Sequence, residues 1–176
     1  MAEYLSDAAP DILAINHIDD GDALMLATQF NRQWAYRGGQ AIFWNARFSP
    51  ARVHESYLPA PRLPAFERRG LLRVDGRCTD RETALLATRF APDRGRARDL
   101  RLTRTVIRET RTQRMLLFIA NPMVGVSAFS DLGFSAGNAC ATPALMLATR
   151  GCTLQSCLAR AYVPGRGAEL IARIKV

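Results

Sequence analysis

The sequence predicts a mixed-sheet α/β sandwich, and three observations support this prediction. Short apolar runs of strand length alternate with longer segments that have helical periodicity. Some of the strand-like runs follow one another directly, as antiparallel neighbours in a sheet do. The chain has 176 residues, of which 48% are hydrophobic, and this is enough to bury a core. We therefore expect one α/β domain spanning residues 1–176.

The expected elements follow the periodicity of the apolar residues. Strands are expected near residues 11–18, 39–45, 68–75, 83–90, 115–120 and 169–175. Helices are expected near residues 1–9, 20–31 and 95–112. We assign no element to residues 134–164, where glycine, proline, cysteine and threonine show no clear period.

The net charge is +8, which favours acidic ligands or partners. The basic residues are almost all arginine, and Lys175 is the only lysine. Arginine suits bidentate contacts with phosphate, but the same bias is typical of a GC-rich genome, and we favour that second cause. No apolar run reaches transmembrane length and no signal-peptide pattern opens the chain, so we expect a cytoplasmic protein.

The four cysteines show no metal-binding pattern. Cys78, Cys140, Cys152 and Cys157 include no Cys-x-x-Cys pair, and neither histidine lies at zinc-finger spacing from them. We expect ordinary reduced thiols. A structural zinc, or a disulfide between Cys152 and Cys157, is the alternative.

Six segments carry a resemblance to a known family. In chain order they are residues 11–18, 39–48, 66–74, 85–90, 116–122 and 165–170. Their order and hydrophobic spacing resemble the strands of the endonuclease/exonuclease/phosphatase superfamily. The resemblance runs from residue 11 to the end and implies the α/β sandwich of that superfamily. It lacks the usual first strand, because residues 1–9 resemble the end of a helix.

The same resemblance implies that charged site residues of the family have been exchanged. His17 stands where the family has a glutamate that holds a divalent metal, and Arg89 stands where it has a histidine. Near the C-terminus, Arg166 and Gly167 replace an aspartate and a histidine. His17 has an alternative role as a hydrogen-bonded structural residue at a strand end, which is the more common case.

The family's Gly-Asp-Phe-Asn segment is matched only in part. Ile119 stands at the position of the aspartate, whereas Asn121 is kept. Asn121 would orient a phosphate if it acted as in the family, but it is also a typical turn residue before Pro122.

These exchanges remove what metal-assisted phosphodiester cleavage needs. Such chemistry depends on hard oxygen ligands around Mg²⁺ or Mn²⁺ and on a base that activates water. A guanidinium about 4 Å from a divalent ion is repelled by about 4 kcal/mol per unit charge pair at an effective dielectric constant of about 20. We therefore expect no metal or other cofactor, and a catalytically degenerate protein that binds phosphate-like anions or has a regulatory role.

Several arginines are candidates for binding the anion. Arg89 and Arg166 would converge on the cleft if the fold is that of the family. Six arginines also follow helical spacing on the expected helix 95–112: Arg94, Arg98, Arg101, Arg104, Arg108 and Arg111. This row predicts contacts with a phosphate-containing ligand or a nucleic acid, although a solvated helix face is the more common explanation.

Two other hypotheses remain open. In the first, the chain is a divergent metal-dependent phosphodiesterase that holds Mg²⁺ or Mn²⁺ with unmatched acids. The candidate acids are Asp75, Asp80, Glu82 and Asp131, and they should then converge near Asn121. In the second, the gene product is decayed and folded without a selected role. The sequence does not distinguish the possible ligands or the oligomeric state.

Overall fold

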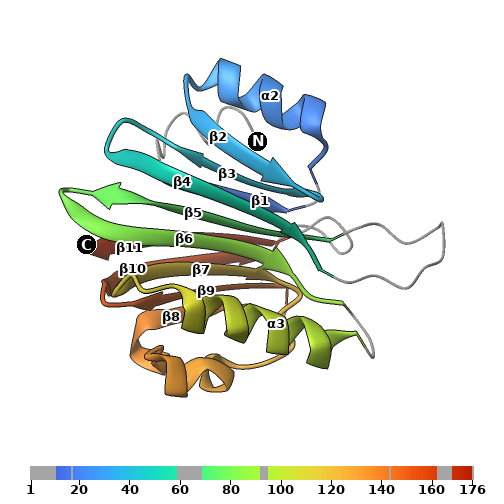
Figure 1. Ribbon diagram of the computed structural model, residues 1–176, viewed down its shortest axis with the longest axis vertical. Helices are drawn as coiled ribbons and strands as arrows, with labels where there is room; N and C mark the ends of the chain where they lie inside the picture. The colour runs from blue at the N-terminus through green and yellow to red at the C-terminus, as the bar shows by residue number, and fades with distance from the viewer. Residues whose placement is uncertain are drawn as a thin grey trace.

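The computed structural model describes residues 11–16, 18–58, 69–91, 95–142, 144–161 and 168–175. Three strands near the N-terminus form one antiparallel sheet: β1 (Ile12–Asn16), β2 (Gln33–Arg37) and β3 (Gln40–Trp44). Their order is β1-β3-β2. Helix α2 (Asp20–Gln29) connects β1 to β2 and covers one side of this sheet (Figure 1). Its N-cap is Asp19, whose side chain accepts a hydrogen bond of 2.7 Å from the Asp22 N–H.

A six-stranded sheet forms the centre of the molecule. Its strands are β4 (Phe48–Tyr57), β5 (Gly70–Cys78), β6 (Arg81–Arg89), β7 (Arg114–Ala120), β8 (Ala139–Ala141) and β9 (Leu145–Arg150). Their order is β4-β5-β6-β7-β9-β8. Strands β6 and β7 are parallel, and their crossover contains helix α3 (Arg96–Glu109). The other strand pairs of this sheet are antiparallel, so the sheet is mixed.

Two further strands form a hairpin. They are β10 (Thr153–Ala161) and β11 (Ala168–Lys175), which pair antiparallel and lie against β8 and β9. Two short 3-10 helices, η1 (Val126–Leu132) and η2 (Ala136–Asn138), lie between β7 and β8. Within the described ranges, no helix has the length and apolar character that are needed to cross a membrane.

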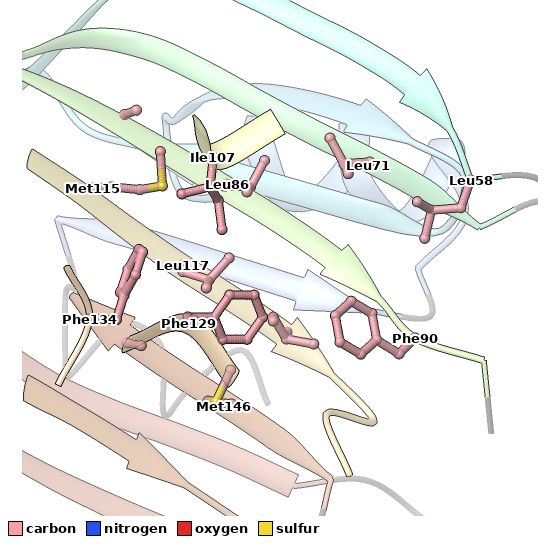
Figure 2. Close-up of a cluster of buried hydrophobic side chains, with 13 residues drawn as sticks. Leu58, Leu71, Leu86, Phe90, Ile107, Met115, Leu117, Phe129, Phe134 and Met146 are labelled. Carbon is pink, nitrogen blue, oxygen red and sulfur yellow. The ribbon is translucent and has the colours of Figure 1, made fainter. Parts of the chain in front are cut away.

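The hydrophobic core has three clusters, which correspond to the layers of a sandwich. The first lies between α3 and the six-stranded sheet, where Ile107, Phe129 and Leu117 meet (Figure 2). The second lies between the two sheets and includes Trp44 from β3 and Leu85 from β6. The third packs α2 onto the three-stranded sheet. The predicted mixed-sheet α/β sandwich is confirmed.

Most of the expected elements are present, and the unassigned region holds strands. The expected strands and the helices near 20–31 and 95–112 agree with β1, β3, β5, β6, β7, β11, α2 and α3 to within a few residues. The sequence did not predict β2, β4, β8, β9 or β10. Three of these, β8, β9 and β10, fall within residues 134–164, where short strands and turns leave no sustained period. The expected helix at residues 1–9 lies outside the described residues, so the missing first strand stays a prediction.

One interpretation of the cysteines was wrong. Cys140 is disulfide-bonded, whereas we expected reduced thiols. Cys78 and Cys152 are free and buried, in agreement with the expectation. Disulfides are typical of oxidising compartments. The disulfide of Cys140 therefore does not support the cytoplasmic location, which stays a prediction. The single-domain organisation also stays a prediction.

Candidate functional site

Several strands end together at one end of the sandwich, which we call the site end. It is defined by Asn16 at the end of β1, Arg89 at the end of β6 and Ala120 at the end of β7. The two sheets are joined there by a hydrogen bond of 3.1 Å from the Gly70 N–H to the Gly38 carbonyl oxygen. The site end therefore contains the ends of strands from both sheets.

The side of each sheet that faces the core between the sheets is called the inner face. In the three-stranded sheet, Asn16 and Arg37 lie opposite Gln40 on neighbouring strands. Side chains alternate along a strand, so these three residues share a face with Ile42, which belongs to the core between the sheets. Polar side chains from three strands are thus directed to the inner face at the site end.

The six-stranded sheet adds a cation to the same place. Arg89 is separated by an even number of residues from Leu85 and Ala87, which belong to the core between the sheets. It therefore projects from the inner face at the last position of β6. Its side chain is half-buried. A half-buried guanidinium in this position is suited to bind an anion.

Gln40 is the most unusual of these residues. It is fully buried, with 0% of its surface exposed. Neither its Oε1 nor its Nε2 atom has a hydrogen-bond partner among the residues that the structure describes. Burying an amide without partners costs several kcal/mol in an apolar reference solvent and about 1–3 kcal/mol in proteins. Such a group in a native protein needs an explanation, and binding is one.

An ion pair links the two sheets beside Gln40. The Arg37 guanidinium donates to the Glu55 carboxylate of β4 at 2.5 Å, and both side chains are about one-third exposed (34% each). Glu55 lies opposite Leu72, so it is on the inner face of the six-stranded sheet. Within this pair, the charges of Arg37 and Glu55 offset each other.

The two sheets approach each other very closely at Gly70. A Cβ atom placed on Gly70 would lie 1.9 Å from the Arg37 carbonyl oxygen and 2.5 Å from its carbonyl carbon. No residue other than glycine fits there without moving one sheet. Gly70 thus fixes the position of Arg37 relative to β5.

Backbone strain is found where β7 ends. Asn121 and Met123 have positive φ values of 50° and 40°, which residues other than glycine seldom adopt. The Asn121 N–H donates to the Ala144 carbonyl oxygen at 2.7 Å, and this bond helps to hold the turn. Strained residues of this kind are often found at functional sites.

Three solved structures show what this fold resembles. An endonuclease/exonuclease/phosphatase from Bacteroides vulgatus superimposes with a TM-score of 0.74 at 11% identity, covering 99% of this chain and 88% of that one. The Bacteroides thetaiotaomicron mannosyl-6-phosphatase gives 0.70 at 12% identity, covering 97% and 88%. TDP2 from D. rerio, complexed with a single-strand DNA product, gives 0.70 at 10% identity, covering 99% and 89%.

The chain has the fold of the endonuclease/exonuclease/phosphatase superfamily. No family model matches the sequence, and no curated protein matches it significantly. At these identities the structures establish the fold and not the activity. The similarity that was inferred from six segments of the sequence is thus confirmed at the level of the fold.

The structure places three of the positions that the resemblance identified. Arg89 and Asn121 lie at the site end, at the end of β6 and directly after β7. Ile119 has 1% of its surface exposed and belongs to the core cluster under α3, on the side of the sheet away from the inner face. An aspartate in its place would be buried among apolar side chains. The matched positions His17, Arg166 and Gly167 lie outside the described residues.

The arginines of the expected row on α3 differ in the contacts that they make. Arg98 and Arg101 are exposed, whereas Arg94 lies outside the described residues. Arg104 donates to the Ala128 carbonyl oxygen and to Asp131. Arg108 also contacts Asp131, at 3.3 Å. Two of the six arginines, Arg104 and Arg108, therefore attach η1 to the helix.

The unmatched acids do not converge near Asn121. Asp75 contacts Arg73 at 2.8 Å and His54 at 3.0 Å, on the face of β5 away from the inner face. Asp80 and Glu82 lie at the β5–β6 turn, at the opposite end of the strands from Arg89. Asp131 is held by α3. Among the described residues, no group of three or more His, Cys, Asp or Glu side chains could hold a metal ion. These residues do not fit the metal that the superfamily resemblance implies.

Sequence reasoning missed the polar residues that the inner face brings together. They are Asn16, Arg37, Gln40 and Glu55. One signal was available for Gln40, because it is the only polar residue of an otherwise apolar strand, β3. Arg37 and Glu55 gave no signal, because β2 and β4 were not predicted.

Proposed function

We propose that this chain is a catalytically degenerate protein with the endonuclease/exonuclease/phosphatase fold, which binds phosphate-like anions at the site end. The observation that carries this proposal is the position of Arg89, on the inner face at the end of β6, in the same end of the sandwich as the buried Gln40 amide. A guanidinium and an amide N–H are the donors that phosphate oxygens accept.

Two observations support the degeneracy of the site. The position of the family's aspartate is taken by Ile119, which is committed to the core under α3. The four acids that would rebuild a metal site are distributed over β5, the β5–β6 turn and η1. Without a bound cation, the guanidinium of Arg89 would attract an anion and would not repel a metal ion.

The structures of the same fold suggest which ligands to test. TDP2 was crystallised with a single-strand DNA product, and mannosyl-6-phosphatase is named for a phosphorylated sugar. Both contain a phosphoryl group, and we propose that this group is what the site end recognises. The exposed Arg98 and Arg101 would add salt-dependent contacts if the ligand is a nucleic acid.

The proposal is tested by titrating the purified protein with inorganic phosphate and with a single-stranded oligonucleotide. The Arg89→Ala variant should weaken phosphate binding by about 10- to 100-fold, because hydrogen bonds to charged groups contribute about 1.5–3 kcal/mol. Arg81→Ala is the matched control, since Arg81 is exposed at the other end of the same strand. The control should bind phosphate as the wild type does.

Catalysis is tested in parallel with a generic phosphodiester and plasmid DNA, in Mg²⁺, in Mn²⁺ and with a chelator. We expect no metal-dependent turnover. Turnover that the chelator abolishes would refute the degeneracy and revive the alternative of a divergent metal-dependent phosphodiesterase. Equal phosphate affinities for wild type and Arg89→Ala would refute the assigned anion site.

A further inference from the structure

A second group of polar atoms is buried behind the site end, on the α3 side of the six-stranded sheet. Asp99 of α3 is fully buried and contacts Arg69, which precedes β5, through a 3.0 Å ion pair between Oδ2 and NH2. Thr103 follows one helical turn after Asp99 on the same buried face of α3. We call Arg69, Asp99 and Thr103 the Asp99 cluster. Asp99 is thus buried, although it belongs to the arginine-rich helix.

Each member of the Asp99 cluster has one polar atom without a partner. These atoms are the Nε of Arg69, the Oδ1 of Asp99 and the Oγ1 of Thr103, and none has a hydrogen-bond partner among the described residues. Arg69 Nε–H is a donor, Asp99 Oδ1 is an acceptor, and a threonine hydroxyl is both. A water molecule placed between the three atoms would accept from the arginine, donate to the carboxylate and bond to the hydroxyl. Buried waters typically make about three such bonds.

The Asp99 cluster also holds the backbone that leads to the site end. Asp99 Oδ2 accepts a hydrogen bond of 2.8 Å from the Ala91 N–H, two residues after Arg89. The Arg69 carbonyl oxygen accepts from the Leu58 N–H at 2.8 Å, and the next residue is Gly70. One carboxylate is thus connected both to the strand end that carries Arg89 and to the start of β5, which contacts Arg37.

We propose that the Asp99 cluster binds one structural water and that, through this water, Thr103 and Arg69 orient Asp99 so that it positions Arg89 for anion binding. The positioning role depends on the proposed function of the site end. The water site does not depend on it, because it follows from the three buried polar atoms. Asp99 is a positioning residue here and does not touch the ligand.

Thr103→Val is the decisive variant, because valine keeps the size of threonine and removes only the hydroxyl. It should weaken phosphate binding by about fivefold, the usual effect of one hydrogen bond. Thr103→Ser restores the hydroxyl and should restore most of the affinity. Thr105→Val is the control, since Thr105 is exposed on the same helix and its hydroxyl bonds only the Arg101 carbonyl oxygen at 3.1 Å.

Two readouts separate positioning from a general loss of stability. Phosphate affinity is measured far below the melting temperature, where all variants are folded. Hydrogen exchange of the Ala91 amide reports on the bond to Asp99, and it should be faster in Thr103→Val than in the wild type. A high-resolution crystal structure of the wild type should show a water within hydrogen-bond distance of the three atoms.

The possible results of these experiments distinguish failure of this inference from failure of the proposed function. Equal phosphate affinity and equal Ala91 exchange in Thr103→Val, Thr105→Val and the wild type would overturn the inference. So would a crystal structure without a water between the three atoms. A wild type that binds no phosphate would refute the proposed function and the positioning role with it, whereas the crystal structure would still decide the water site.

Discussion

The two ends of the space between the sheets differ in what they bury. At the site end, the inner face carries Gln40, Arg37 and Arg89. At the opposite end, it carries Trp44 and Phe48, whose rings meet edge to face with centroids 5.9 Å apart. One end thus contains amides and charges, and the other end contains aromatic rings.

The free thiols belong to the apolar end. Cys78 lies at the end of β5 in the core between the sheets, and Cys152 is buried in the turn after β9. Burial raises the pKa of both thiols, and the charge of Asp11 raises that of Cys78 further. Thiols with a raised pKa form little thiolate and are unreactive. The chemistry of the apolar end therefore serves packing.

This difference shows that the site end contains a residue that lowers the stability of the fold. Apolar burial contributes about 25 cal/mol per Å², whereas a buried amide without partners lowers stability. Gln40 at the start of the otherwise apolar strand β3 is a residue that packing alone does not favour. A buried polar residue of this kind is expected where it contributes to binding.

The largest effect is expected at Gly70, where the sheets touch. Gly70→Ala should lower the free energy of unfolding by about 3 kcal/mol or more, because its Cβ would lie 1.9 Å from the Arg37 carbonyl oxygen. Urea denaturation measures this change. Gly137→Ala is the control, since no atom lies within 4 Å of a Cβ placed there. The variants of Gly70 and Gly137 should therefore differ clearly in stability.

A second glycine tests whether the two ends are independent. A Cβ on Gly76, toward the apolar end, would meet the Ser49 carbonyl oxygen at 2.4 Å and the Phe48 ring at 2.7 Å. Gly76→Ala should also be destabilising, but the folded protein should keep its affinity for phosphate. Gly70→Ala should lose affinity as well as stability. If both variants changed phosphate binding equally, the distinction between the two ends would fail.

The next largest effect on stability is expected at two buried polar residues of the inner face. Thr149 is fully buried and donates to the Cys152 carbonyl oxygen at 2.9 Å, whereas Gln40 has no partner among the described residues. Thr149→Val should lower the free energy of unfolding by about 1 kcal/mol, the net value of one hydrogen bond. Gln40→Met should raise it by about 1–2 kcal/mol, because an unpaired amide is replaced by an apolar chain of similar size.

The two variants should have opposite effects on binding and stability. Gln40→Met should reduce phosphate affinity while it raises the melting temperature, and Thr149→Val should do neither. Calorimetry and phosphate titration on the same samples check both expectations. A less stable Gln40→Met variant would mean that the amide has a partner in solution and that the polar site end is structural.

The sequence predicted the fold better than it predicted the site. Strands such as β6 and β7 are long apolar runs, and their order was sufficient to suggest the superfamily's sandwich. Arg89 and Asn121 were identified through the resemblance to the superfamily, at the end of β6 and directly after β7. Arg37 and Glu55 could not be found, because their ion pair joins β2 to β4, and both strands are too polar to be recognised from local pattern.

Asp99 shows a second limit of sequence reasoning. Its spacing within the arginine-rich helix suggests a solvated carboxylate, but helix α3 turns Asp99, Thr103 and Ile107 toward the sheet. The buried face of this helix is partly polar, so hydrophobic periodicity alone does not identify Asp99 as a buried residue. The tertiary contacts with Arg69 and with the Ala91 N–H compensate for the burial of this charge.

The smallest effect is expected at Asp131, which lies on the surface outside both ends. Hydrogen bonding from Arg104 holds the pKa of this carboxyl below its usual value of 3.8. Because the pKa is lower in the folded protein than in the unfolded chain, the ion pair adds stability above pH 3.8, and this stability is lost as the pH falls through the folded-state pKa. Asp131→Asn should therefore lower the melting temperature slightly at pH 7, and the difference should shrink below pH 3.8 and in high salt. A difference that stayed constant from pH 7 to pH 2 would show that packing of η1, and not the charge of Asp131, connects this segment to α3.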